Sequence, residues 1–325
     1  MFIPTLLSTV LSILAFARAA QFSNPIRDSG ADPFIVYDNS TSQYYLITTT
    51  ATDLRLISSP TLGGLYNGTD TQVYSTNDTQ VLRHVWAGEL HKVDGSWYIY
   101  FSWLERPWVI KGGADPLDAY PGPPVQLSAD FGIDGTILTH NSSLYFLWSC
   151  LTKSPSADSI CIAPLSSPTS LVNASTAVIS SPTEEWENQG NASINEAPQA
   201  LYWEGEKYLT FSASHCKSAG YSLGLLHLTG DDPLLPSSWT KTEGPVFSSA
   251  NGEYGPGHNG IFASPDGTEL WNVYHAVTNS SGSCGTDRQT FAQPIDLSQF
   301  STEGPIFGIP LAKGHVIDGP SEKAA

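Results

Sequence analysis

The sequence predicts an all-β protein, specifically a five-bladed β-propeller, and two observations point to that fold. First, strand-like runs follow one another along the chain, either alternating or briefly continuous in apolar residues, and Gly, Pro, Asn and Asp separate them. We find no convincing amphipathic helix. Second, a turn followed by an aromatic strand recurs five times. Such a repeat suits propeller blades of four strands each.

The five copies share a polar turn and a strand rich in aromatic residues. They are NSTSQYYLITTT (39–50), VDGSWYIYFSW (93–103), HNSSLYFLWSC (140–150), WEGEKYLTFSAS (203–214) and PDGTELWNVYHA (265–276). The equivalent positions Tyr45, Tyr98, Tyr145, Tyr208 and Trp271 are spaced by 53, 47, 63 and 63 residues. A β-sandwich, the alternative all-β fold, does not explain a unit repeated at that interval.

The first segment of the chain, MFIPTLLSTVLSILAFARAA, has an apolar run from Leu6 to Phe16 followed by small residues. This pattern predicts a secretory signal peptide over residues 1–19, and therefore an extracellular protein. The run is too short to cross about 30 Å of hydrocarbon, which argues against a membrane anchor. We expect residues 20–325 to form one propeller domain, because no linker divides them, with a frayed tail from Gly314 to Ala325.

The chain is acidic but carries few charges. It has 14 Lys and Arg against 31 Asp and Glu, a formal net charge of −17, although charged residues make up only 14% of its 325 residues. This excess repels nucleic-acid phosphates and anionic lipids, since binding to them needs clustered Lys and Arg. We therefore expect no nucleic-acid and no membrane partner, and a surface built mostly of uncharged polar groups.

The four cysteines, an even number in an oxidising compartment, are expected to form disulfides. Cys150 and Cys161 lie at ends of adjacent strand-like runs and are favoured as one pair, which leaves Cys216 with Cys284; free buried thiols are the alternative. The Asn-x-Ser/Thr motifs, which must lie on the surface if they are glycosylated, begin at Asn39, Asn67, Asn77, Asn141, Asn173, Asn191 and Asn279.

Three acidic residues stand near the start of the presumed innermost strand in three different blades. They are Asp32 in GADPFIVYD, Asp134 in GIDGTILTH and Glu196 in INEAPQALYW, each among small or apolar neighbours. Innermost strands surround the central channel, so we expect these carboxylates to converge there. Such a group suits glycoside hydrolysis, in which one carboxylate deprotonates water and another, held protonated, donates to the leaving oxygen. Taken singly, each residue is also explained as a turn Asp or a capping Glu.

At these residues the sequence resembles glycoside hydrolase family 43, from about Asn24 to Ile295. The matching pattern is an Asp-Pro, an Ile-Asp-Gly and a Glu-Ala-Pro that open blades one, three and four. The resemblance implies a five-bladed propeller hydrolase that inverts anomeric configuration. It also implies that Asp32 is the general base, Glu196 the general acid, and Asp134 the residue that orients the acid and tunes its pKa. Inversion implies a base-to-acid separation of roughly 6.5–9.5 Å, with room for one water.

Further motifs look most like the exo-acting α-L-arabinofuranosidase group of that family. They are VWAGELH (85–91), IDGT (133–136), YFLWS (145–149) and GPGHN (255–259). This resemblance implies release of L-arabinofuranose from α-1,5-linked arabinan of plant cell walls. β-Xylosidase and endo-arabinanase remain open, although the Glu in VWAGELH argues mildly against the first. A non-catalytic propeller lectin is the alternative from another class; it would repeat similar sugar pockets in every blade, whereas each acid here occurs once.

Five further residues are candidates for substrate binding. The indole faces of Trp86 and Trp103 can stack on a sugar ring, although packing between blades explains them as well. Glu89 lies in the VWAGELH motif. The resemblance places His258 at the channel axis, where it would hold the waters of a calcium ion, because calcium itself prefers oxygen ligands; a structural His in a tight turn is the alternative. Arg288 resembles an arginine that reaches the sugar or the catalytic acids, with a surface ion pair as the alternative. The expected chemistry requires no cofactor.

Overall fold

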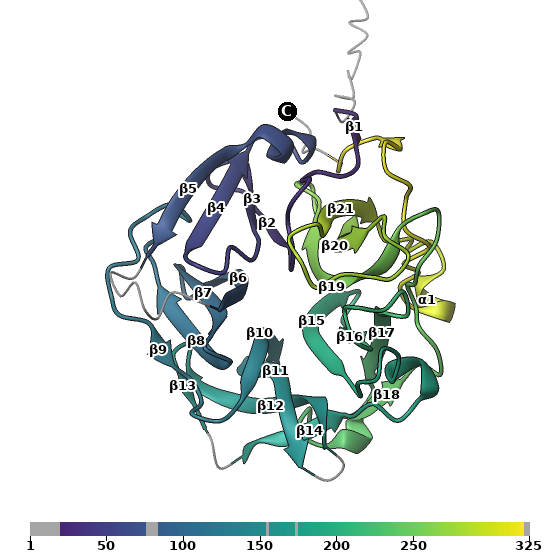
Figure 1. The fold of residues 1–325 in the computed structure, drawn as a ribbon. Helices are drawn as coiled ribbons and strands as arrows, with labels where there is room; N and C mark the ends of the chain where they lie inside the picture. The colour runs from purple at the N-terminus through teal and green to yellow at the C-terminus, as the bar shows by residue number, and fades with distance from the viewer. Residues whose placement is uncertain (1–19, 76–83, 154–155, 173–174, 322–325) are drawn as a thin grey trace, which may run out of the picture.

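The computed structural model describes residues 20–75, 84–153, 156–172 and 175–321. Five antiparallel sheets surround a central axis as the blades of a propeller, and the chain passes through them in order around the ring (Figure 1). This arrangement confirms the fold class and the number of blades predicted from the repeat. The predicted signal peptide over residues 1–19 and the candidate glycosylation sites Asn77 and Asn173 lie outside the described residues.

Each blade is a meander whose first strand lies nearest the axis (Figure 1). Blade 1 consists of β2 (Phe34–Asp38), β3 (Gln43–Ile47), β4 (Leu54–Ser59) and β5 (Thr69–Tyr74); blade 2 of β6 (Val85–Val93), β7 (Ser96–Trp103), β8 (Arg106–Lys111) and β9 (Val125–Gln126); blade 3 of β10 (Gly132–His140), β11 (Ser143–Lys153), β12 (Ser156–Ser167), β13 (Ser170–Leu171) and β14 (Ala177–Ser180); blade 4 of β15 (Asn195–Trp203), β16 (Glu206–Ala213), β17 (Ser222–Leu228) and β18 (Trp239–Lys241); blade 5 of β19 (Tyr254–Ala263), β20 (Leu270–Val277) and β21 (Gln289–Pro294). The repeated aromatic segments of the sequence are the second strands of the five blades.

The core consists of five apolar clusters, each packed between two neighbouring blades. Strand β3 shows how one strand serves two clusters. Tyr44 and Leu46 face the cluster shared with blade 5, whereas Tyr45 and Ile47 face the cluster shared with blade 2. Successive side chains of a strand point to opposite faces, so a strand covered on both faces is apolar throughout rather than alternating. This explains the continuous apolar runs in the sequence.

The N-terminal segment closes the ring by running alongside β21 of blade 5. The Asn24 side chain donates to Ala292 O at 2.8 Å and accepts from Ala292 N at 2.9 Å. Further along, β1 (Phe22–Ser23) pairs with β22 (Val316–Ile317). The expectation of a frayed tail from Gly314 was therefore wrong for the part that the structure describes, because strand pairing with the N-terminal segment holds it.

The described residues contain one α-helix, α1 (Phe300–Glu303), and no helix among them is long and apolar enough to span a membrane. Both predicted disulfides, Cys150–Cys161 and Cys216–Cys284, are confirmed. The first joins β11 to β12 within blade 3. The candidate glycosylation sites in the described part of the chain are all exposed, as glycosylation requires; they are Asn39, Asn67, Asn141, Asn191 and Asn279.

One hydrogen bond is repeated between all neighbouring blades, and we call it the spoke bond. Near the start of each inner strand, one non-glycine residue has a left-handed backbone, with φ between 44° and 57°. Its backbone N–H donates to a side chain at the end of the second strand of the preceding blade. The five spoke bonds are Asp32 to His275 Nδ1, Ala87 to Thr49 Oγ1, Asp134 to Ser102 Oγ, Ala197 to Ser149 Oγ and His258 to Ser212 Oγ, at 2.7–3.1 Å.

The spoke residues of blades 2, 3 and 4 lie within β-bulges. The register of strand pairing shifts between Trp86 and Glu89, between Ile133 and Thr136, and between Glu196 and Gln199. A left-handed backbone at a non-glycine residue costs on the order of 1 kcal/mol or more, so a surrounding contact must hold it in place. A bulge re-aims a side chain out of the regular alternation. Each inner strand therefore has, near its start, one residue with a strained backbone that a spoke bond to the preceding blade holds in place.

Replacing Ser102 by Ala is expected to destabilise the protein by about 1–3 kcal/mol, because it leaves the buried backbone N–H of Asp134 without its acceptor. Urea unfolding at fixed pH measures this difference. The matched control is Ser96→Ala at the partly exposed start of the same strand, for which we expect a change within about 0.5 kcal/mol. Equal effects of the two substitutions would show that the spoke bond contributes no stability.

Candidate active site

Three carboxylates from three blades lie within electrostatic reach of one another. Asp32 stands just before β2, Asp134 lies in β10 and Glu196 in β15. After burial, the charges of Glu196 and Asp32 are the main causes that raise the pKa of Asp134, and the charge of Asp32 also raises the pKa of Glu196. The structure therefore brings together the three acids that the sequence analysis selected.

All three acids stand near the start of an inner strand, as the sequence analysis expected, but their positions there are not equivalent. Asp32 and Asp134 are spoke residues, whereas Glu196 comes one residue before the spoke residue Ala197. Glu196 shares its position with Trp86, which precedes the spoke residue of blade 2. Each of the two pairs with a serine of its own blade, and that serine accepts the spoke bond from the following blade. The bulge explains this offset, because it places two successive residues of the inner strand at the rim of the channel.

Asp32 is surrounded by groups that favour its ionised form. Arg288 Nη1 donates to Oδ1 at 2.6 Å, and the Thr49 hydroxyl donates to Oδ2 at 2.6 Å. The Nδ1 atom of His258 lies 3.3 Å from Oδ1. Burial by itself raises the pKa of Asp32, but the Arg288 charge above all, together with His258, His275 and Thr49, holds that pKa well below its usual range. Asp32 is therefore ionised throughout the neutral and mildly acidic range.

His275 is a neutral imidazole that accepts a hydrogen bond from the backbone of Asp32. Its Nδ1 accepts the backbone N–H of Asp32 at 3.1 Å, so the ring proton lies on Nε2. Burial, and then the nearby Arg288 charge, lowers the pKa of His275 well below its usual value. The 3.4 Å contact between Nδ1 and Asp32 Oδ1 is consequently not an ion pair. The protonated Nε2 is buried and has no hydrogen-bond partner in the described part of the chain.

Glu196 has a different environment from Asp32. The Tyr221 hydroxyl donates to Oε1 at 2.7 Å. Burial raises the pKa of Glu196 to about 7, the charges of Asp158 and Asp32 add to the increase, and Tyr221 limits it. Burial and the Glu196 charge likewise raise the pKa of Asp134 well above its usual range. Two such carboxylates titrate as a pair, and this pair retains a proton near neutral pH.

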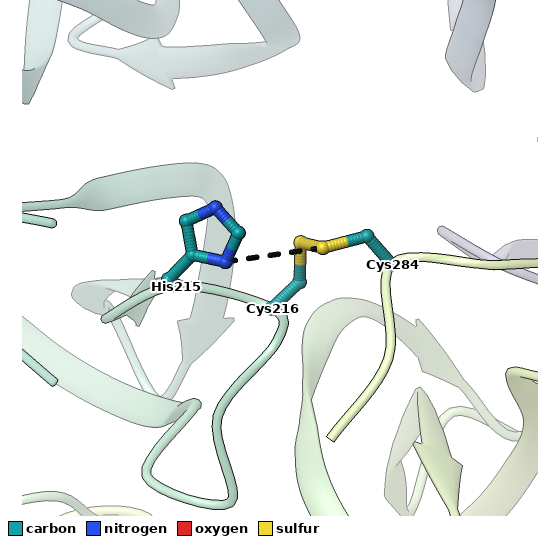
Figure 2. Close-up of side chains that lie close together, drawn as sticks. All are labelled: His215, Cys216 and Cys284. Carbon is teal, nitrogen blue, oxygen red and sulfur yellow. Dashed lines mark hydrogen bonds between the residues drawn. A yellow bond between two sulfur atoms is a disulfide. The ribbon is translucent and has the colours of Figure 1, made fainter. Parts of the chain in front are cut away.

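Arg288 is held by the loop that precedes β21. Its Nε donates to Gly285 O at 3.1 Å, and its Nη2 donates to Cys284 O at 3.3 Å. Cys284 is bonded to Cys216 in the loop after β16, and His215 lies beside the disulfide (Figure 2). A Cβ atom on Gly282 would lie only 2.6–2.7 Å from the backbone of Ser218, so the two loops are also in direct contact. The disulfide thus ties the loop of Arg288 to the loop that leads to Tyr221.

The other predicted substrate-binding residues are placed in two different ways. Glu89 is buried, and its carboxylate accepts from Gln199 Nε2 at 3.0 Å and lies 2.7 Å from His91 Nε2. Trp103 packs on Trp108, with ring centroids 5.0 Å apart. Trp86 is half-buried and stacks on His84 at 4.8 Å. Trp86 and Trp103 are thus both half-buried and packed on another ring, whereas Glu89 is a buried carboxylate held by polar contacts within the protein.

Glu89 belongs to a group of buried polar side chains that connects the inner strands of several blades. Gln199 joins this group to blades 3 and 5, because its Nε2 also donates to Thr136 Oγ1 at 3.2 Å and its Oε1 accepts from Ile261 N at 3.4 Å. Gln199 also lines a cavity of about 310 Å³, together with other residues of the inner strands that include Phe34 and His91.

The residues around His258 do not offer the oxygen ligands that calcium prefers. The nearest carboxylate, Asp32, already binds Arg288 and Thr49, and a second imidazole lies beside it. Within the described ranges, His215, Cys216 and Cys284 are grouped closely enough to hold a metal ion, but both sulfurs are joined in the disulfide (Figure 2). The water-held calcium at His258 stays a prediction, and no chemical step is assigned to it.

The sequence analysis missed Tyr221 and the residues that accept the spoke bonds. A signal for the acceptors was present, because each stands four positions after an aromatic residue of the repeat. In the five copies this position is Thr49, Ser102, Ser149, Ser212 and His275. A column of four hydroxyl side chains and one imidazole marks a conserved hydrogen-bonding task within the repeat. Tyr221 lies in a loop outside the repeat, where no pattern of the sequence singles it out.

Comparison with known proteins gives consistent matches. The family model described as glycosyl hydrolases family 43 matches residues 22–299. An extracellular exo-α-(1→5)-L-arabinofuranosidase from Streptomyces avermitilis is 34% identical over 318 residues, covering 90% of this chain and 64% of that protein. An α-L-arabinofuranosidase 43 from Humicola insolens is 33% identical, covering 91% of this chain and 65% of that protein. The chain thus spans slightly less than two thirds of the length of these relatives.

The fold has solved counterparts as well. The crystal structure of an α-L-arabinofuranosidase from Lactobacillus brevis superposes with a TM-score of 0.81 at 26% identity, covering 90% of this chain and 98% of that one. A thermostable family-43 glycoside hydrolase, at 23% identity, gives a TM-score of 0.73 and shows the same fold.

Proposed function

Since this chain belongs to glycosyl hydrolase family 43, we propose that it is a secreted α-L-arabinofuranosidase that releases L-arabinofuranose from α-1,5-linked arabinan. Two relatives of this chain bear the name extracellular exo-α-(1→5)-L-arabinofuranosidase, at 34% and 31% identity. The observation that carries the mechanism is the contrast between a carboxylate held ionised, Asp32, and another, Glu196, whose pKa lies at about 7. Inverting glycosidases need that contrast.

Asp32 acts as the general base. Its ionised carboxylate accepts a proton from a water molecule as the water oxygen bonds to the anomeric carbon of the arabinofuranosyl unit. Arg288 and Thr49 fix both carboxylate oxygens, so the base keeps one orientation. A guanidinium also offers donors to sugar hydroxyls, and Arg288 therefore suits a second contact with the substrate.

Glu196 acts as the general acid on the other side of the bond. It gives its proton to the glycosidic oxygen as the bond from that oxygen to the anomeric carbon breaks. The configuration at the anomeric carbon inverts because the water attacks from the face opposite to the leaving group. The like charges of Asp134 and Glu196 oppose ionisation of both groups together, so the pair retains a proton that Glu196 can donate.

The substrate is expected to be neutral. A chain of formal net charge −17 repels polyanions such as polygalacturonate, and the uncharged arabinan side chains of pectin avoid that repulsion. Trp86 shares its strand position with Glu196 and is only half-buried, so its indole can stack on the sugar ring. Secretion rests on the N-terminal apolar segment and on the relatives named extracellular.

The residues near the start of the five inner strands argue against a propeller lectin, which would repeat similar sugar pockets in every blade. Their spoke residues are Asp32, Ala87, Asp134, Ala197 and His258, so the blades do not repeat one sugar-binding motif.

Replacing Asp32 by Asn or Glu196 by Gln is expected to lower kcat/KM by at least about 10²-fold. The loss at Glu196 should be larger on arabino-oligosaccharides than on an aryl α-L-arabinofuranoside, because an activated leaving group needs less protonation. The loss at Asp32 should be similar on both. Glu253→Gln, which alters a buried carboxylate bonded to Lys313 N, is the control and should retain full activity. If wild type releases no arabinose from these substrates or from arabinan, but cleaves an aryl β-D-xyloside, the substrate assignment is wrong.

Replacing both Cys216 and Cys284 by Ser is expected to lower kcat by about 10-fold, because the loop that holds Arg288 against Asp32 loses its tie to blade 4. The acidic limb of the pH profile should also move to higher pH as Asp32 loses part of its cationic support. Replacing both Cys150 and Cys161 by Ser is the matched control, since that disulfide lies within blade 3. Removing a disulfide costs about 2–4 kcal/mol, so activities are compared where unfolding curves show both variants folded. Equal kcat values for the two variants would contradict the positioning role.

A further inference from the structure

Tyr221 makes the hydrogen bond that distinguishes the two oxygens of Glu196. Its hydroxyl donates to Oε1 at 2.7 Å. Tyr221 is only 1% exposed, and it enters the site from the turn between the disulfide-tied loop and β17. A buried hydroxyl beside a titrating carboxylate influences both where the proton resides and how tightly it is held.

The ring of Tyr221 is closely packed. It stacks on His275, with centroids 5.8 Å apart and planes 8° from parallel. A Cβ atom on Gly257 would lie 2.3 Å from Cε1 of the tyrosine, so only glycine leaves room for the ring at that position. These contacts hold the ring where its hydroxyl meets Glu196.

A spoke bond lies beside Tyr221. Ser212 Oγ accepts the backbone N–H of His258 at 2.7 Å. Burial, and then the Glu196 charge, raises the pKa of the Tyr221 phenol well above its usual value, although Ser212 lowers it in part. At neutral pH the phenol therefore keeps its proton and donates it in the hydrogen bond to Oε1 of Glu196.

We propose that Tyr221 is a positioning residue for Glu196, which it serves by occupying Oε1 so that the transferable proton resides on Oε2. This inference rests on the proposed function and names a residue that acts through the general acid. The bond also stabilises the ionised form of Glu196, which limits the increase in pKa caused by burial. An acid whose pKa lies near the working pH both carries its proton and releases it readily.

The test is the titration of Glu196 in wild type, Tyr221→Phe and Tyr120→Phe. Tyr120 is the matched control, because it is also buried and its hydroxyl donates to Pro116 O, away from the three acids. Carbon NMR of the side-chain carboxyls of labelled glutamate follows the titration, and Glu196→Gln identifies the signal. We expect the midpoint of Glu196 near pH 7 in wild type and in Tyr120→Phe, and about 0.5–1 pH unit higher in Tyr221→Phe, because a donor to the ionised form has been removed.

The kinetic readout separates positioning from general structural damage. The alkaline limb of kcat/KM should move upward with the Glu196 midpoint, and kcat should fall about 3- to 30-fold, more on arabino-oligosaccharides than on an aryl arabinofuranoside. An unchanged midpoint in Tyr221→Phe overturns the proposal even if activity falls. Because the titration needs no substrate, this failure is distinguishable from failure of the proposed function, which appears as a wild type that titrates as expected but releases no arabinose.

Discussion

The architecture of the site depends on the spoke bond, the hydrogen bond from each inner strand to the preceding blade. It holds a left-handed residue near the start of every inner strand, and the three candidate catalytic acids occupy that position or the one before it. Asp32, Asp134 and His258 are spoke residues, whereas Glu196 and Trp86 precede one. A single backbone device, repeated five times, therefore brings side chains from distant parts of the sequence to the same end of the channel.

Differences between the blades then give similar carboxylates different tasks. The spoke bond of Asp32 is accepted by the imidazole of His275, and the loop before β21 supplies Arg288. The positive charge of Arg288 keeps the Asp32 carboxylate ionised. Burial, with the charges of Asp158 and Asp32, raises the pKa of Glu196 to about 7, whereas its phenol partner Tyr221 limits that increase. The disulfide between Cys216 and Cys284 connects the loops behind both environments. The proposed base and the proposed acid thus differ through their surroundings, as the proposed glycosidase mechanism requires.

The sequence was sufficient to predict the blades and to select three acids that lie near one another in the structure, because both depend on local patterns. The recurring aromatic strand indicated five blades, and short acidic motifs marked the inner strands. The one-residue offset of Glu196 was not predictable in this way, since a β-bulge leaves no reliable mark in a single sequence. Contacts such as Arg288 with Asp32, 256 residues apart, depend on ring closure rather than on spacing. Tyr221 was missed because its role arises from a loop position outside the repeat.

The most direct test of the central claim, that an ionised Asp32 activates water while Glu196 donates a proton, is proton NMR of the first sugar released. Direct attack by water on an α-L-arabinofuranoside predicts that the β anomer appears first, and that the α anomer grows only as the product mutarotates. Initial release of the α anomer would show retention through a covalent intermediate. That result would contradict the assignment of Asp32 as a base that acts through water.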